Sequence, residues 1–341
     1  MSCSTRAEMI STKLRQALSR GDLHSSSPWL DLPTVSPCRA LVHWIGECWM
    51  KPFEFHEPTS VEEASDLLLR HGKAAVPLAG GTALLIDIRH GEIQPGHVIS
   101  LWTIPGLRDL RSNGSLHIGA LLTVTELGEA LLAPAVEGLR ESARSLGSWQ
   151  IQNLATVGGN ICKASPGADL VPPLLCLDAD LELQSSTKRR EVPLDGFLVG
   201  PDQTAIAPGE VLTHIHVPPP PPRTGTAFLK LMRRQALDCS IVSVCARISL
   251  DTDGTTCTEA RIGLAAVAPN PFRAKRAEAA LLGTRLDGET LRHVAALARS
   301  EARPISDVRA SAEYRSLIVA ALVERAIRLA AERARGATGG K

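Results

Sequence analysis

The stretch "LATVGGNICKASPGADL", residues 154–170, decides the fold, because it sets two glycines directly after Thr156-Val157 and one acid, Asp169, behind a Ser-Pro-Gly turn. Glycine weakens any helix or strand that it interrupts, since it loses more conformational freedom on folding than other residues. Glycines are therefore expected where the backbone must bend tightly or where another molecule comes close to it. The stretch therefore indicates a tight turn, with or without a ligand beside it.

A second glycine turn, Ala79-Gly80-Gly81-Thr82-Ala83, has the same design. Both turns follow a predicted strand or extended segment, and their successive backbone amides can form a concave nest for an anion. Neither turn has the phosphate-loop pattern G-x-x-x-x-G-K-[ST] or the dinucleotide pattern G-x-G-x-x-G. The sequence thus disfavours a nucleoside triphosphatase and a Rossmann dehydrogenase. Spacing alone leaves open two tight turns without any ligand.

Composition narrows the class of protein. The chain has 341 residues and is 44% hydrophobic, which is enough for a core divided over two or three domains. Its 37 basic and 36 acidic residues are interspersed, so no basic stripe indicates a nucleic-acid partner. No apolar run approaches the roughly 20 residues of a membrane helix. We therefore expect neither a nucleic-acid partner nor a membrane span.

The cysteines are scattered and form no Cys-x-x-Cys pair. This spacing disfavours a zinc ribbon or an iron–sulfur cluster bound by this chain alone. We expect reduced, mostly buried thiols of a cytoplasmic protein. The eight cysteines are Cys3, Cys38, Cys48, Cys162, Cys176, Cys239, Cys245 and Cys257.

The chain changes character twice. Residues 1–49 are Ser-rich and only patchily periodic, so we expect a poorly ordered extension, with an upstream mis-start preferred over a targeting role. A new start follows at Met50, with a helix predicted from Ser60 to His71 and capped by Ser60. Five prolines, Pro218–Pro222, form a stiff connector and mark the best domain boundary.

Two hairpins are predicted from alternating apolar residues. Asn113-Gly114 is a type I′ turn signal between two such runs. After the prolines, residues 239–250 and 257–267 each place their apolar side chains on one face, which predicts a half-buried antiparallel hairpin with a turn at 251–254. C-terminal helices can cover this face, because apolar residues recur there at helical spacing. These residues are Leu317, Ile318, Ala321, Leu322 and Leu329.

Three longer stretches carry a resemblance to a known family. They are "PLAGGTALLIDIRHGEIQPGHVISL" at residues 77–101, "QIQNLATVGGNICKASPGADLVPPLLCLDADLEL" at 150–183 and "FLKLMRRQALDCSIVSV" at 228–244. Together they resemble the flavin-binding medium subunit of the molybdenum hydroxylases, which include xanthine dehydrogenases and aerobic carbon monoxide dehydrogenases. The likeness extends from Met50 to about Ala331, and "SAEYRSLIVAALVERAI" at 311–327 resembles the closing helix of that family.

The resemblance implies an α+β fold in two domains. Residues 50–222 would form a two-subdomain FAD-binding domain of the vanillyl-alcohol-oxidase (PCMH) type. Residues 223–335 would form a smaller domain of the carbon monoxide dehydrogenase flavoprotein type, with a three-stranded antiparallel sheet and helices. Residues 336–341 would be a tail.

The resemblance also implies which residues hold FAD. The glycine amides would bind its diphosphate, the hydroxyls of Thr82 and Thr156 would donate hydrogen bonds, and Asp169 would accept from a ribose hydroxyl. The implied set is Pro77, Leu78, Ala79, Gly80, Gly81, Thr82, Ala83 and Leu84, then Thr156, Val157, Gly158, Gly159 and Asn160, then Asp169, Leu212 and Lys230.

The function implied by the resemblance is electron transfer within a multi-subunit oxidoreductase. A partner subunit with [2Fe–2S] clusters would deliver electrons from a molybdenum-cofactor subunit, in a heterotrimer or a dimer of heterotrimers. FAD would pass the electrons to NAD or another acceptor, and no residue of this chain is expected to act as a catalytic acid or base. A self-contained flavin oxidase of the same fold and a flavin-free scaffold subunit remain alternatives.

Two further residue types invite a chemical interpretation. His214 and His216 lie two apart in a predicted strand and could face one metal, but no third ligand is expected nearby, so an ordinary polar strand face is favoured. Cys162 follows the second glycine turn closely, and its reactivity depends on its pKa and exposure. No metal is therefore expected in this chain.

Overall fold

The computed structural model describes residues 51–234 and 237–336. All described residues belong to the second of the two units of the chain, Met50–Lys341. The predicted extension 1–49 lies outside the described residues, as does the predicted tail beyond Gly336. Among the described helices, none is both long and apolar enough for a membrane crossing.

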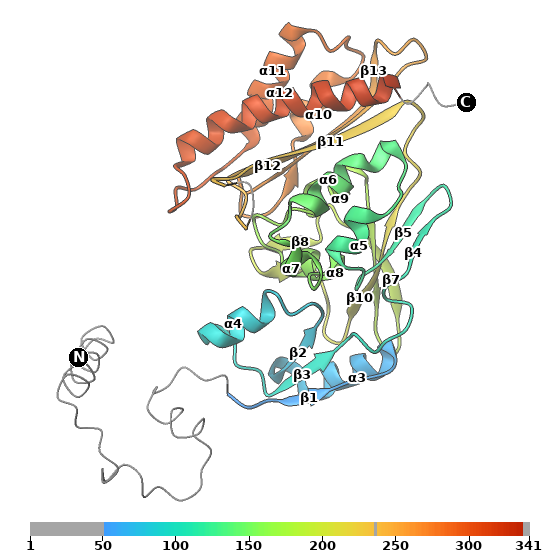
Figure 1. The fold of residues 1–341 in the computed structure, drawn as a ribbon, viewed down its shortest axis with the longest axis vertical. Helices are drawn as coiled ribbons and strands as arrows, with labels where there is room; N and C mark the ends of the chain where they lie inside the picture. Colours follow the sequence, from blue (N-terminus) through green and yellow to red (C-terminus); the bar gives the residue numbers. More distant parts are fainter. Residues whose placement is uncertain (1–50, 235–236, 337–341) are drawn as a thin grey trace, which may run out of the picture. The chain divides into compact units, whose positions relative to one another are not determined.

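A small parallel sheet opens the described chain (Figure 1). Its strand order is β1-β3-β2, from β1 (Glu54–His56), β3 (His97–Ser100) and β2 (Ala75–Leu78). Helix α3 (Val61–His71) begins as predicted, because the Ser60 side chain accepts a hydrogen bond from the Glu63 amide. The 3₁₀ turn η1 (Gly72–Ala74) then leads into β2, and helix α4 (Leu84–His90) follows the first glycine turn.

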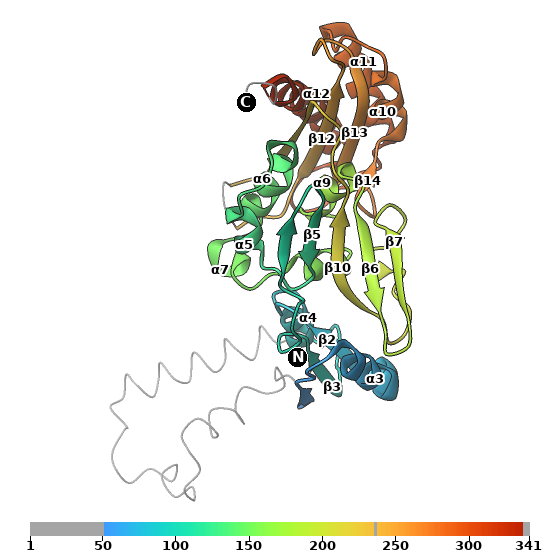
Figure 2. The same cartoon turned by 90° about the vertical axis from the view of Figure 1, so that its right-hand side faces the viewer.

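A five-stranded antiparallel sheet follows, with the order β4-β5-β10-β6-β7 (Figure 2). Helices from the segment that connects β5 to β6 pack on this sheet. Their apolar side chains, such as Val157 and Leu174, share one core with Ile118 and Ile215 of the sheet. The elements are β4 (Leu110–Ser112), β5 (Leu116–Gly119), α5 (Val124–Glu129), η2 (Pro134–Val136), α6 (Glu137–Ser145), α7 (Trp149–Gln152), α8 (Val157–Cys162), α9 (Val171–Cys176), β6 (Asp180–Gln184), β7 (Arg189–Pro193), β8 (Leu198–Gly200), β9 (Gln203–Thr204) and β10 (Val211–Val217).

The hairpin β4–β5 is confirmed, but its turn is not of the predicted type. Ser112 pairs with Leu116, so three residues connect the strands. A type I′ turn needs positive φ at both central residues. Gly114 has φ of 97°, whereas Asn113 is not among the described residues with positive φ. The prediction of a type I′ turn is therefore wrong, although the dipeptide marked the hairpin correctly.

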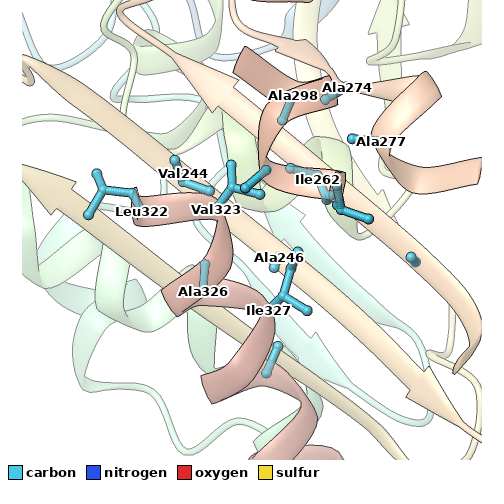
Figure 3. Packing of buried hydrophobic residues seen from close by; sticks show 14 of the residues in the cluster. Val244, Ala246, Ile262, Ala274, Ala277, Ala298, Leu322, Val323, Ala326 and Ile327 are labelled. Atoms are coloured by element: carbon cyan, nitrogen blue, oxygen red, sulfur yellow. The ribbon is translucent and has the colours of Figure 1, made fainter. Parts of the chain in front are cut away.

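Beyond the prolines lies a second antiparallel sheet, β11-β12-β13-β14. Helix α12 lies along this sheet, and Val323 and Ile327 of the helix pack near Val244 and Ala246 of β12 (Figure 3). The α+β class is confirmed, and the predicted three-stranded sheet gains a fourth strand of two residues. The elements are β11 (Thr224–Leu231), β12 (Val242–Leu250), β13 (Cys257–Ala265), β14 (Phe272–Arg273), α10 (Lys275–Leu281), α11 (Gly288–Glu301) and α12 (Ala312–Gly336).

The hairpin β12–β13 is not half-buried as predicted. All nine residues of β12 are buried, because helix α9 packs against the face that α12 leaves open. A Cβ on Gly263 of β13 would lie 2.5 Å from the Pro172 carbonyl oxygen of α9, so the contact is close. Just after α9, the Asp178 carboxylate lies 2.9–3.0 Å from Arg247, Arg261 and Arg273 of this sheet.

The helix that covers the sheet is confirmed, but part of its predicted face is wrong. Leu317 is 50% exposed, and Ala321 is exposed as well. The buried stripe runs instead through Val319, Val323 and Ile327, together with Leu322, Ala326 and Ala330. The five prolines lie between β10 of one sheet and β11 of the next. We keep a domain division at Pro222 as a proposal.

Candidate functional site

A cavity of about 710 Å³ lies between the small parallel sheet and the five-stranded sheet. This volume is typical of small-molecule and cofactor sites. Most of the residues predicted from the sequence line it: Pro77, Ala79, Gly80, Gly81, Thr82, Ala83, Leu84, Thr156, Gly158, Gly159, Asn160 and Leu212. Leu78, Val157, Asp169 and Lys230 are not part of the lining.

The first glycine turn presents free hydrogen-bond donors to the cavity. Within the described part of the chain, the backbone amides of residues 80–83 donate to no protein acceptor. Gly81 has φ of 71°, a left-handed conformation that favours glycine. The Trp102 indole donates to the Ala79 carbonyl oxygen at 2.7 Å and so holds the start of the turn. A run of free amides in a tight turn can bind an anionic group.

The two glycine amides of the second glycine turn already have acceptors within the protein. The Gly158 amide donates to the Ala120 carbonyl oxygen at 2.8 Å, and the Gly159 amide donates to the Thr156 hydroxyl at 3.0 Å. Thr156 thereby acts as the N-cap of α8. The prediction that both amides are available to a phosphate is therefore wrong. This turn contributes the wall of the cavity instead.

The space that a side chain would need at these glycines is occupied mainly by other parts of the protein. A Cβ on Gly80 would lie 1.9 Å from the Leu154 carbonyl oxygen, in the segment that leads into the second turn. A Cβ on Gly158 would lie 2.7 Å from the Ala120 Cβ. A Cβ on Gly159 meets only the Thr156 hydroxyl at 2.8 Å and the Ala79 Cβ at 3.8 Å. The two turns thus pack backbone to backbone, and Gly159 is the one that leaves space toward the cavity.

Asp169 and Lys230 form a buried ion pair outside the cavity. The Lys230 ammonium lies 2.7 Å from one carboxylate oxygen, and the Ser240 hydroxyl donates to the other at 2.6 Å. Burial raises the pKa of Asp169, while Lys230 and Ser240 oppose that shift. Both oxygens of Asp169 already have protein partners, so its contact with a ribose stays a prediction. Asn160 connects this region to the cavity, because its side-chain oxygen accepts from the Leu170 amide at 3.2 Å.

Charged side chains that the sequence analysis did not single out also line the cavity. Lys163 lies 2.9 Å from both Asp87 and Asp202, so it connects the end of α8 to α4. Lys73 and Glu210 also line the cavity. Spacing is the signal that could have found Lys163, because it follows Gly159 by four residues and so lies on the same face of α8.

Cys162 lines the cavity as a neutral thiol. Burial raises the pKa of Cys162 to about 12, far above neutral pH. A thiolate is the nucleophilic form of cysteine, and that form is disfavoured here. Cys162 is therefore a wall residue, not a reactive group.

The expectation that His214 and His216 have no further ligand nearby is wrong. Glu182 of β6 lies 3.2 Å from the His214 Nδ1 and 3.3 Å from the His216 Nε2. However, Arg189 pairs with the same carboxylate, and the Thr213 hydroxyl donates to it at 2.5 Å. The carboxylate is already neutralised, which fits a polar strand face rather than a metal site.

Comparisons with known proteins agree with this geometry. Residues 51–220 match the family described as the FAD binding domain in molybdopterin dehydrogenase, and residues 227–330 match the CO dehydrogenase flavoprotein C-terminal domain. The chain is 35% identical to the carbon monoxide dehydrogenase medium chain of Afipia carboxidovorans, over 83% of this chain and 98% of the relative. It is 33% identical to the xanthine dehydrogenase FAD-binding subunit of Escherichia coli O157:H7, over 84% and 97%.

A solved structure gives the same result. The fold is similar to a chain of the reconstituted CO dehydrogenase from Oligotropha carboxidovorans, with a TM-score of 0.80 and 34% identity. The similarity covers 84% of this chain and 99% of that one. The fold of this chain is therefore shared with nearly the whole length of that chain.

Proposed function

The chain belongs to the FAD-binding subunits of the molybdopterin dehydrogenases, and on this premise we propose that it is the electron-transfer subunit of a molybdenum-containing hydroxylase or dehydrogenase complex. It is an oxidoreductase subunit, and its cofactor is FAD. When bound, FAD supplies the redox chemistry, here the transfer of electrons from the [2Fe–2S] clusters of a partner subunit to NAD or another acceptor.

One observation supports this placement of the cofactor: residues 80–83 line the cavity, and their backbone amides donate to no acceptor in the described part of the chain. These donors fit the negative charge of a diphosphate, and the Thr82 hydroxyl stands beside them. Apolar side chains such as Leu101, Leu121 and Ile206 supply a wall that excludes water from a planar ring system. The residues present therefore fit FAD, and the chain's own task is to bind and orient it.

The lengths of the relatives favour a subunit over a self-contained flavin oxidase. The chain covers 98% of a protein named a medium chain and 97% of a protein named an FAD-binding subunit. We propose a heterotrimer, or a dimer of heterotrimers, with an iron–sulfur subunit and a molybdenum-cofactor subunit. We also propose a cytoplasmic location, supported by the free thiols of Cys162, Cys176, Cys239, Cys245 and Cys257.

A purified complex tests the function. The tagged full-length chain, isolated from its native cells, should contain about one FAD per chain and co-purify with two partners that carry iron and molybdenum. Under anaerobic conditions, NADH should bleach the flavin absorption if NAD is the physiological acceptor, whereas another acceptor would leave NADH without effect. A chain without flavin would support the scaffold alternative. Turnover of an organic substrate by the isolated chain would support the oxidase.

A matched pair of variants tests the cavity itself. Gly159→Val should lower the FAD-to-protein ratio at least ten-fold, because its methyl groups enter the cavity. Gly167→Val is the control, since a Cβ there meets nothing within 4 Å and Gly167 does not line the cavity. An undiminished ratio in Gly159→Val would contradict the placement of FAD.

A further inference from the structure

Three histidines from separate elements meet on one face of the small parallel sheet. His56 ends β1, His71 ends α3 and His97 begins β3. Ring nitrogens of these three residues all lie within 4.8 Å of one another. The rings are only partly buried, with 23% of the His56 side chain and 19% of the His97 side chain exposed. An ion from solvent can therefore reach them.

Glu54 adds a carboxylate to the same place. In the parallel pair β1–β3, Glu54 lies opposite His97, and residues two apart in a strand share a face, so Glu54 and His56 point the same way. The Glu54 carboxylate lies 3.3 Å from the His97 Nδ1 and 3.9 Å from the His56 Nε2. Glu54, His56, His71 and His97 are called the histidine cluster below.

The distances among three members of the histidine cluster, Glu54, His56 and His97, are close to those between the ligands of a tetrahedral metal site. The His56 Nε2 and the His97 Nδ1 are 3.1 Å apart. Zinc bonds to nitrogen and oxygen of about 2.1 Å place neighbouring ligand atoms roughly 3.4 Å apart in a tetrahedron. The separations of 3.1, 3.3 and 3.9 Å among Glu54, His56 and His97 therefore need only small side-chain shifts around an ion. The His71 ring stacks on the His97 ring, with centroids 3.6 Å apart, so it must turn before its nitrogen can bind the same ion.

The charges around the histidine cluster also differ from those around His214 and His216, the other histidine group. The Glu182 carboxylate, which contacts both His214 and His216, is already paired with Arg189. In the described part of the chain, the recorded ion pairs of Glu54 involve only His56 and His97. An uncommitted carboxylate beside three imidazoles is a ligand set that suits zinc and neighbouring divalent transition metals.

We propose that the histidine cluster binds one divalent transition-metal ion, with Zn²⁺ as the expected ion. The role is structural, because the cluster joins β1, β3 and the end of α3. None of its four residues lines the flavin cavity, although Gly72 and Lys73, directly after His71, do. His97 pairs with Ala75 at the start of β2, whereas the first glycine turn follows Leu78 at the other end of that strand. The ion thus fixes the strand that leads into the turn, and this proposal goes beyond electron transfer.

The test uses the FAD-loaded full-length chain after removal of metals with EDTA. Isothermal titration with Zn²⁺ should show one site per chain that is lost, or weakened at least ten-fold, in His56→Gln and His71→Gln. Glu54→Gln should weaken binding as well, and folding should tolerate it because this side chain is 73% exposed. His293→Gln, at an exposed position of α11, and His214→Gln, in the other histidine group, are the controls.

Thermal unfolding gives a second measurement. At a free Zn²⁺ concentration about 100-fold above Kd, the melting temperature of the unsubstituted chain should rise by about 5 °C, and that of His71→Gln should not. The d–d absorption of Co²⁺ in the same site should indicate tetrahedral coordination. Binding that is absent, or that Glu54→Gln and His71→Gln leave unchanged, would overturn the proposal, and loss of binding in His214→Gln alone would move the site elsewhere.

Discussion

At the scale of single residues, the glycines of the two turns serve different physical purposes. Gly81 allows a left-handed backbone, with φ of 71°. Gly80 makes room for the Leu154 carbonyl, and Gly158 makes room for Ala120. Gly159 alone leaves space toward the cavity. The same Gly-Gly motif therefore serves different structural purposes, and substitutions at the four positions should affect folding and cofactor binding differently.

Alanine at two of these positions should separate folding from cofactor binding. Gly80→Ala forces a Cβ to within 1.9 Å of a backbone oxygen, so we expect the free energy of unfolding of the FAD-free chain to fall by about 3 kcal/mol. Gly159→Ala weakens the Thr156 cap by about 1 kcal/mol but gains a similar amount of helix propensity. Urea denaturation measures both, and equal losses at the two positions would contradict the contacts described for Gly80.

The glycine pairs in the sequence marked where the chain bends, but they did not reveal which backbone amides are free to donate hydrogen bonds. A Gly-Gly pair marks a bend, and both bends line one cavity. Whether an amide is free depends on distant partners, and Ala120 lies far from Gly158 along the chain. Asp169 illustrates the same limit, because its partners Lys230 and Ser240 come from beyond the proline connector. Local pattern alone cannot supply such partners.

At the scale of elements, one carboxylate holds the segment that enters β10. Glu210 lines the cavity, and Arg190 of β7 donates to both of its oxygens at 2.7 Å. The Ala207 amide donates to the same group at 2.8 Å. Hydrogen bonds from Arg190 lower the pKa of Glu210, burial opposes this shift, and the Ala207 amide adds to the lowering. The ionised form therefore stabilises the folded chain.

This pair predicts a pH dependence of stability. Because the pKa of Glu210 is lower in the folded chain than in the unfolded chain, its contribution is fully present above about pH 5 and is lost as the pH falls below about 4.3. We expect Glu210→Gln to cost about 2 kcal/mol at pH 7 and clearly less at pH 3. Urea denaturation at both pH values tests this, with the exposed Glu313→Gln as control. A cost independent of pH would rule out an ionic role for Glu210.

Helices and strands themselves were predictable, because their periodicity is local. Ser60 capped α3 as expected, and the alternating runs formed hairpins. The buried face of α12 was harder, because Leu317 is apolar and yet exposed. Period 3.6 identifies a helix, but the sheet that it meets decides which of its apolar residues are buried. The half-buried assignment of β12 failed for the same reason, since α9 covers its second face.

At the scale of the whole second unit, ion pairs connect the segments on either side of α9 to the sheet β11-β12-β13-β14. Asp169 follows α8 on the cavity side, while Lys230 lies on β11, and both side chains are at most 8% exposed. Asp178 and its three arginines form a second connection. Removing one partner of a buried pair leaves an uncompensated charge, which costs more than removing both partners together. These pairs therefore make that sheet sensitive to changes in the segments on either side of α9.

A double-mutant cycle tests this coupling. Asp169→Asn and Lys230→Met should each lower the free energy of unfolding by about 3 kcal/mol, and the double variant should lose much less than the sum. Urea denaturation of the FAD-free chain measures the cycle, and FAD titration measures cofactor affinity separately. Additive losses would contradict the ion pair. If FAD affinity falls in Asp169→Asn and stays low in the double variant, Asp169 contacts the cofactor as well.

The close approach of Gly80 to the Leu154 carbonyl has a consequence for protein engineering. The two segments, residues 77–84 and 154–160, have complementary shapes where they pack against each other. If only one of these segments were replaced by that of a relative, the new segment would not fit against the unchanged one, and their close backbone packing would be lost. Chimeras of this family should exchange both segments at once.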